Sequence, residues 1–166
     1  FLFKFIKSYL YSMGDNHLSI LQEAQSLVTD LLLNKLSKNI HFHTLQHTQE
    51  VVAACEKMAD HYQLGADDRF ALILAAWFHD TGYTSGDAKG HENVSIEIAD
   101  EFMRARQLDD VTIQKVKGCI GATRMPQSPA TAIEKIICDA DLFHLGTGSF
   151  DEKNRLLRQE LIDFAG

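Results

Sequence analysis

The chain has 166 residues, of which 45% are hydrophobic and 23% are charged, and its formal net charge is −7. This length suits one domain with a substantial buried core, and the composition is that of an ordinary globular protein. The negative charge argues against a surface for a nucleic-acid polymer or an anionic membrane, because both need clustered lysine and arginine. It does not exclude a small anionic substrate, since a bound metal ion can supply local positive charge.

The first residues, FLFKFIKSYLYS, differ in character from the rest of the chain and precede Met13. They combine aromatic side chains with lysines, and we interpret residues 1–12 as an upstream extension before a helical domain at residues 13–166. A helix lying on a membrane surface is the alternative for this segment. No apolar run reaches the roughly 18 residues of a transmembrane helix, and no cleavable signal peptide is visible.

Apolar residues recur at helical spacing through almost the whole chain, and β-strand alternation is nearly absent. Asp67 is predicted to cap the third of these helices. Glycine and proline mark loops at residues 83–90 and 124–130. The sequence therefore predicts an all-α fold, a compact single-domain helical bundle. A last helix follows a turn at residues 145–151, and the helices before it cover approximately residues 16–36, 44–62, 67–82, 91–106, 110–121 and 133–141.

The three cysteines, Cys55, Cys119 and Cys138, lie in apolar helical segments and show no CxxC spacing. We predict that they are buried free thiols, which indicates a reducing, cytoplasmic compartment. A disulfide bond or a nucleophilic thiol is the alternative interpretation of these positions.

Polar side chains interrupt several of the apolar helix faces. His47 lies on the inward stripe of the second predicted helix, and His79 and Asp80 end the third helix directly after the apolar run LILAAWF. Asp141 lies one helical turn after an inward isoleucine and is predicted to face the core. Asp139 is rotated away from that stripe, so we prefer Asp141 as the inward carboxylate.

Each of these residues alone has an ordinary interpretation, since an inward histidine is usually a hydrogen-bonded core residue and a terminal aspartate is usually a cap. Together they form a net anionic cluster, because no matching lysine or arginine accompanies them into the core. A divalent cation resolves this charge. Imidazole nitrogen and carboxylate oxygen suit Mn, Fe, Ni, Co or Zn. The predicted ligands of one such ion are His47, His79, Asp80 and Asp141.

This order of residues resembles the H…HD…D signature of the HD superfamily of metal-dependent phosphohydrolases. The segment FHTLQHTQEVV is similar to the family's first-ligand helix, and AAWFHDTGY is similar to its central motif. HENVSIEIADEF and ICDADLFHLG are similar to two further blocks found in one bacterial branch. The HD pair alone is a weak signal, whereas four ordered blocks between about residues 37 and 150 are a specific one.

The resemblance implies an all-α fold and the same four ligands around one divalent metal ion, with Mn, Fe, Ni, Co, Mg or Zn as candidates. It also implies hydrolysis of a phosphate ester or anhydride, commonly in a nucleotide. Members that bind two metal ions carry two further histidines. His91 is the candidate for the first, but Ala122 and Thr123 stand where we would expect the second. We therefore predict a mononuclear site.

The expected nucleophile is water, because a bound divalent ion lowers the pKa of water towards neutrality. Asp80 is predicted to orient this water, and His91 or Glu92 to protonate the leaving oxygen or to order the metal ligands. For His91 and Glu92, a helix-start residue without a catalytic role is the alternative. A solvated surface position is the alternative for the residues predicted to bind substrate phosphate, which are Lys89, Thr123 and Arg124.

The leading hypothesis is a metal-dependent phosphohydrolase that acts on a small phosphorylated substrate, for which a nucleotide is the first candidate. A regulatory module that binds a metal ion or a nucleotide without efficient turnover is the second. A purely structural helical bundle is the third. Metal content separates the third from the others, and phosphate release separates the first two. The sequence leaves the oligomeric state open, a homodimer included.

Overall fold

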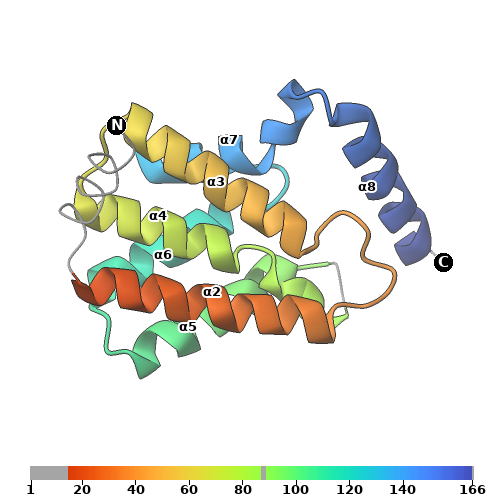
Figure 1. Ribbon diagram of the computed structural model, residues 1–166. Helices are drawn as coiled ribbons and strands as arrows, with labels where there is room; N and C mark the ends of the chain where they lie inside the picture. Colours follow the sequence, from red (N-terminus) through yellow and green to blue (C-terminus); the bar gives the residue numbers. More distant parts are fainter. Residues whose placement is uncertain (1–14, 87–88, 166) are drawn as a thin grey trace.

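The computed structural model describes residues 15–86 and 89–165, and the extension predicted at residues 1–12 lies outside them. All regular secondary structure in this part of the chain is helical, which confirms the predicted all-α fold (Figure 1). No helix within it is long and apolar enough to cross a membrane. In chain order the elements are α2 (Asp15–Lys35), α3 (Leu45–His61), α4 (Ala66–Phe78), the short 3-10 helix η1 (Thr81–Ser85), α5 (His91–Ala105), α6 (Asp110–Ala122), α7 (Ala132–Asp141), the short 3-10 helix η2 (Phe143–Gly146) and α8 (Phe150–Ala165).

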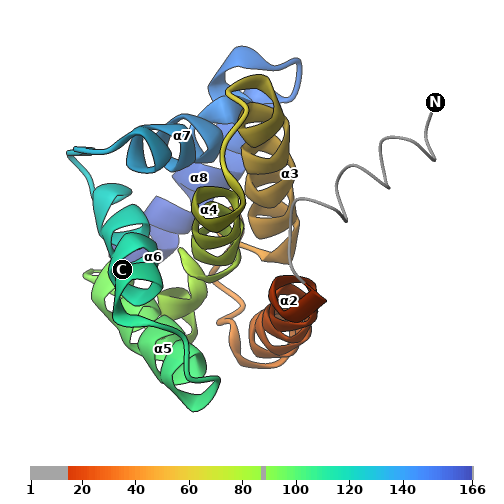
Figure 2. The ribbon, with the colours of Figure 1, turned by 90° about the vertical axis from the view of Figure 1, so that its left-hand side faces the viewer.

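The central element of the bundle is α4. Figure 2 shows it in the middle, with α2, α3, α5, α6 and α7 around it. Every residue from Arg69 to Phe78 is buried, and a helix that is apolar on nearly all sides is stable in such a central position. The two residues that follow it, His79 and Asp80, are consequently delivered to the interior, where they are 0% and 4% exposed.

The third predicted helix is wrong at both ends. α4 stops at Phe78 rather than Gly82. The chain continues as the 3-10 helix η1, and Thr81 Oγ1 donates a hydrogen bond to Phe78 O at 2.8 Å. This bond satisfies one carbonyl that the helix end leaves free. At the other end the helix begins at Ala66, so Asp67 is an acidic residue of the first turn and not the cap.

η1 packs directly against the first turn of α5. Gly82 N donates a hydrogen bond to Ser95 Oγ at 2.8 Å, and a Cβ atom at position 82 would lie 1.9 Å from His91 O. Only glycine permits this close approach of two backbones. The contact holds His91 beside Asp80, with His91 Nε2 3.3 Å from Asp80 Oδ1.

The helices α7 and α8 supply residues at or near the site, Asp141 and Glu160. α7 starts with a capping box, in which Thr131 Oγ1 and the Glu134 carboxylate each accept a hydrogen bond from the other residue's N–H. It ends at Asp141, which enters the interior. α8 stands at one end of the bundle in Figure 1, beside η2 and the loop that precedes α3.

The three cysteines are buried free thiols, as predicted. Burial raises the pKa of the Cys138 thiol to about 11 and raises that of Cys55 well above its ordinary value. Both side chains therefore stay protonated and pack as small apolar groups.

Candidate metal centre

Side chains from three helices meet at the inner end of α4. His47 comes from α3 and Asp141 from the end of α7, 94 positions later in the chain. His47 Nε2 lies 3.0 Å from Asp141 Oδ1 and 3.4 Å from Asp80 Oδ2. His79 Nε2 lies 3.0 Å from Asp80 Oδ2 and 3.7 Å from Asp141 Oδ1. The structure thus brings together all four residues that the sequence suggested as metal ligands.

Two atoms of this cluster, His79 Nε2 and Asp80 Oδ2, are buried and make no hydrogen bond within the described part of the chain. His79 Nδ1 donates to Ala76 O at 2.9 Å, because a carbonyl oxygen can only accept. In the neutral ring, Nε2 therefore carries a lone pair, and this lone pair faces a carboxylate oxygen. Two lone pairs at this distance repel each other unless a cation lies between them.

The separations between donor atoms fit a single ion. Ligands held about 2.1 Å from one ion lie about 3.0 to 3.4 Å apart in octahedral or tetrahedral coordination. The four measured separations run from 3.0 to 3.7 Å, and the donor atoms of His47, His79 and Asp80 all lie within 4.8 Å of one another. Two imidazole nitrogens and two carboxylates also suit a divalent transition metal. The residues present therefore fit such an ion.

The ionisation of the cluster residues shows that a proton would compete with that ion. Burial opposes the charged forms of His79 and Asp80, but each stabilises the charge of the other. The pKa of His79 is consequently raised well above its ordinary value, and the pKa of Asp80 is lowered well below. The pKa of Asp141 is also low, since its hydrogen bond with His47 and its proximity to His79 outweigh burial. Without a metal ion, a proton on His79 balances the carboxylates, and metal binding must displace it.

The second oxygen of Asp80 faces the start of α5. His91 Nε2 lies 3.3 Å from Asp80 Oδ1, and the His91 ring stacks on Tyr83 with 4.0 Å between ring centroids. Burial raises the pKa of Tyr83, so its phenol stays protonated. Glu92 is buried, and its Oε1 lies 3.9 Å from His91 Nε2. Both residues of α5 predicted to be catalytic therefore lie at this edge of the cluster.

The residues predicted to bind substrate phosphate differ in their surroundings. The Arg124 side chain is 49% exposed, and its Nε lies 3.7 Å from Glu92 Oε2. Lys89 is exposed in the loop before α5. Thr123 is buried, and its hydroxyl donates to Ile120 O at 2.8 Å. The Thr123 proton is therefore already used at the end of α6, whereas the two cations remain accessible from solvent.

A second buried carboxylate, Glu160 of α8, lies behind the cluster. Its Oε2 accepts hydrogen bonds from the backbone N–H groups of His41, Phe42 and His43 at 2.9, 2.8 and 3.2 Å. Its Oε1 accepts one from His43 Nδ1. The other nitrogen of this ring, Nε2, accepts from the Tyr83 hydroxyl at 3.4 Å. Glu160 therefore orders the loop before α3 and, through His43, the tyrosine on which His91 stacks.

The sequence pattern gave no signal for Glu160. The apolar residues beside it, Leu161 and Ile162, are 60% and 64% exposed, so the periodicity of α8 does not mark an inward face. Lys153 is a similar case, since it is only 6% exposed and its Nζ donates to Glu50 Oε1 at 2.9 Å. The partners lie 117 and 103 positions away, and local periodicity does not reveal contacts of that range.

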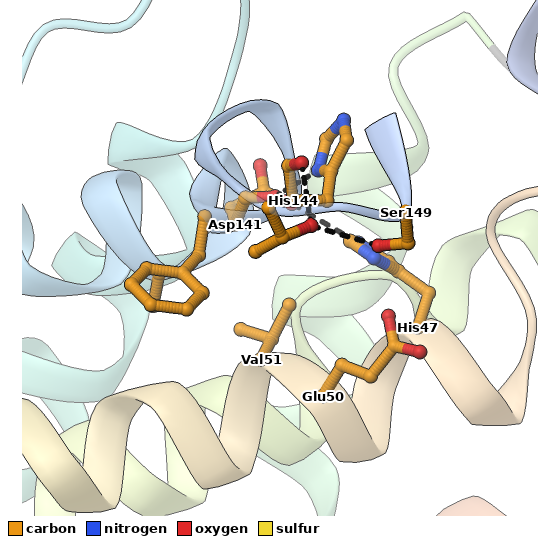
Figure 3. A pocket seen from close by; sticks show the side chains of 9 residues that line it. His47, Glu50, Val51, Asp141, His144 and Ser149 are labelled. Carbon is orange, nitrogen blue, oxygen red and sulfur yellow. Dashed lines mark hydrogen bonds and ion pairs between the residues drawn. The ribbon is translucent and has the colours of Figure 1, made fainter. Parts of the chain in front are cut away.

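A small pocket with a volume of about 140 Å³ opens beside the cluster. Figure 3 shows it between α3 and the segment around η2. The residues labelled there are His47, Glu50, Val51, Asp141, His144 and Ser149. Since two of the cluster residues form part of its wall, a molecule in this pocket would lie next to the metal ligands.

Comparison with known proteins identifies the class. The family model described as the HD domain matches residues 44–146, and the chain therefore belongs to the HD domain family, as the resemblance predicted. The fold is also similar to a solved structure described as a predicted HD superfamily hydrolase from an uncultured Thermotogales bacterium, with a TM-score of 0.65 and 18% sequence identity over 84% of this chain and 74% of that one. The comparison with curated proteins gives no match.

Proposed function

We propose that this chain is a metal-dependent phosphohydrolase that hydrolyses a phosphate ester or anhydride of a small molecule. The observation that carries the proposal is the convergence of His79 Nε2 and Asp80 Oδ2 with two further donor groups. Both atoms are buried and have no hydrogen bond to any described residue. Family membership supports the same activity. A nucleotide is the substrate class that the family resemblance suggests first.

His47, His79, Asp80 and Asp141 would hold one divalent cation, with Mn, Fe, Co, Ni, Zn and Mg as candidates. When bound there, such an ion supplies Lewis acidity for the phosphoryl group and lowers the pKa of water. The protein contributes a rigid, buried set of donors, since His79 is fixed by its bond to Ala76 O at 2.9 Å. Fixed donors of this kind need no rearrangement during the reaction.

Asp80 and His91 would handle the attacking water. Asp80 Oδ1 is turned away from His79 and towards His91 Nε2 at 3.3 Å, where a carboxylate oxygen can accept a proton from water. Stacking on Tyr83 fixes the plane of the His91 ring. Either His91 or the adjacent Glu92 could then deliver a proton to the leaving oxygen, because both lie at this edge of the cluster.

Positive charge for the substrate phosphate would come from Arg124 and Lys89. Arg124 is half exposed, its Nε lies 3.7 Å from Glu92 Oε2, and its Nη2 donates to Asn93 Oδ1 at 2.5 Å, so its guanidinium lies beside the α5 end of the cluster. A planar guanidinium binds phosphate through paired N–H groups. Lys89 is exposed just before the helix that begins at His91 and would supply a second cation.

One observation favours a second candidate, a regulatory module that binds a metal ion or nucleotide without efficient turnover. Ala122 and Thr123 stand near where we expect the second histidine of family members with two metal ions, and the Thr123 hydroxyl is bonded to Ile120 O at 2.8 Å. A centre with one ion provides less charge stabilisation than a centre with two.

Elemental analysis of the purified protein followed by phosphate-release assays tests both candidates. The assays would use nucleotides and simple phosphate esters with added Mn, Mg, Ni and Co. We expect about one bound ion for each chain and metal-dependent release that EDTA abolishes. A bound ion without release from any compound would favour the regulatory module, and a protein that binds none of these ions would overturn both.

A further inference from the structure

The pocket in Figure 3 indicates which chemical group the substrate carries besides its phosphate. His47 and Asp141 belong to both the pocket wall and the metal cluster, and their nearest atoms are 3.0 Å apart. A phosphate held at the cluster would therefore place its ester group at the mouth of this pocket. The following inference rests on the proposed function, because it takes the cluster as the phosphate-binding position.

The size of the pocket limits the group that can enter. Its volume is about 140 Å³, which is close to the roughly 150 Å³ of an engineered cavity that holds benzene. Pockets for larger organic ligands span roughly 300 to 1,000 Å³. Val51 is 1% exposed and forms part of the buried wall, so the pocket cannot deepen easily. A group of about the size of benzene, roughly six heavy atoms, fits within it, and a purine nucleoside would extend beyond it.

The hydroxyl groups in the wall are oriented by a short hydrogen-bond chain. Thr147 Oγ1 donates to His144 O at 2.9 Å, since a carbonyl oxygen only accepts. Its proton is therefore used, and the contact of 2.7 Å with Ser149 Oγ must be a bond that Ser149 donates. Ser149 consequently presents lone pairs, and not its proton, to a molecule in the pocket.

Glu50 adds further acceptor capacity at the mouth. Lys153 Nζ lies 2.9 Å from Glu50 Oε1 and 2.8 Å from Glu50 Oε2. This contact neutralises the carboxylate but leaves lone pairs on both of its oxygens. Among the described residues that line the pocket, none is a lysine or an arginine, so a second phosphate group finds no cation in the wall.

A small pocket with acceptors and a partly apolar wall matches a short carbon chain that carries hydroxyl groups. We propose that it holds the alcohol part of the substrate, and that the substrate is a phosphate monoester of a short polyol or sugar. Hydrolysis breaks the ester P–O bond and forms a P–O bond to the water oxygen, and the alcohol oxygen takes a proton. The products are inorganic phosphate and the free polyol.

The first test compares substrates. Erythritol phosphate, glycerol phosphate and AMP would be assayed with the metal that supports the highest phosphate release. We expect kcat/KM for erythritol phosphate to exceed that for AMP roughly tenfold or more, because the acceptors of the wall pair with the substrate hydroxyls. Ser149→Val fills the pocket and removes its acceptor, and it should lower kcat/KM for erythritol phosphate about five- to tenfold.

Ser26→Val is the matched control. Ser26 lies on an exposed face of α2, where its hydroxyl bonds only to Gln22 O in the preceding turn, so this variant should keep the activity of the unchanged protein with every substrate. A binding measurement complements the assays. In NMR spectra of isotope-labelled, metal-free protein, erythritol should shift the amide signals of Val51 and Ser149, and adenosine should not.

The outcomes separate the two proposals. Efficient hydrolysis of AMP that Ser149→Val does not change, together with no response of Val51 to erythritol, would overturn the polyol assignment and leave the phosphohydrolase intact. Failure to hydrolyse any phosphate ester with any metal would overturn the proposed function, and the polyol assignment with it. Preference for erythritol phosphate that is lost in Ser149→Val but kept in Ser26→Val would support both.

Discussion

Asp80 and Glu160 are both buried carboxylates, 4% and 2% exposed, but their neighbours satisfy them in opposite ways. Glu160 accepts hydrogen bonds from three consecutive backbone N–H groups and from the His43 ring. Asp80 turns Oδ2 towards two histidine nitrogens, and this oxygen makes no hydrogen bond to the residues that the structure describes.

The difference shows that burial alone does not mark a functional carboxylate. Buried polar groups are usually satisfied, and a satisfied one such as Glu160 stabilises the fold. An unsatisfied group such as Asp80 costs free energy that the protein retains only where a ligand completes the site. Variants at the two positions should therefore differ in metal binding.

The largest effect is expected for Asp80→Asn, which removes the charge and keeps the size. Metal should be lost and phosphate release should fall about a thousandfold or more, because the ion contributes several kcal/mol of charge stabilisation. The metal-free protein should also lose some stability, because Asp80 and His79 stabilise each other's charge, so metal content and phosphate release are the quantities that distinguish this variant. Elemental analysis, phosphate assays and urea unfolding measure these quantities. Full metal content in this variant would contradict the assignment.

Glu160→Ala should keep its metal, but its unfolding free energy should fall by about 3 kcal/mol because several bonds to a charged group disappear. Glu160→Gln keeps one acceptor oxygen and should recover part of this loss. Glu152→Ala, on an exposed position of the same helix, is the control. Equal urea midpoints for Glu160→Ala and Glu152→Ala would contradict the stabilising role assigned to Glu160.

A further comparison uses two carboxylates of α7, Asp139 and Asp141. Asp141→Asn should lower phosphate release about a hundredfold, because it removes one charged donor from the centre. Asp139→Asn should have no effect, since Asp139 is exposed while Asp141 Oδ1 lies 3.0 Å from His47 Nε2. Both are measured by the same assay at saturating metal. Similar losses for the two variants would mean that the inward carboxylate is wrongly assigned.

The smallest effect concerns pH. Burial opposes the charge of Glu160, but the His43 hydrogen bond outweighs it and lowers the pKa of Glu160 below its ordinary value of 4.5. A lowered folded-state pKa adds stability above pH 4.5, and this stability is lost as the pH falls through the folded-state pKa. The difference in unfolding free energy between the unchanged protein and Glu160→Gln should thus be largest near neutral pH and shrink below 4.5. A difference that grows in acid would reverse the assigned sign.

The sequence predicts the helices well because those before α8 bury an apolar stripe, and the period of that stripe is local information. It predicts the four candidate ligands for a related reason, since polar residues on apolar faces are conspicuous. His47 and Asp141 stand out in this way although 94 positions separate them. The predicted end of α4 is wrong, because the hydrogen bond from the Thr81 side chain to Phe78 O competes with the backbone bonds that would extend the helix.

Other features depend on distant partners and could not be predicted. Glu160 lies on a helix whose neighbouring apolar residues are exposed, and its role exists only because the loop at residues 41–43 turns three N–H groups towards it. The acceptor character of Ser149 likewise follows from the Thr147 bond to a carbonyl oxygen. Hydrogen-bond direction is a property of three-dimensional arrangement and leaves no mark on local periodicity.

The tight packing at Gly82 has a consequence for how the family domain can vary. No methyl group fits there, because it would overlap the carbonyl oxygen of His91 at 1.9 Å. In a saturation mutagenesis experiment, position 82 should therefore tolerate no replacement, although glycine has no side chain with which to act. A substitution at this residue would move His91 away from Asp80 while every side chain of the candidate metal centre stayed chemically intact.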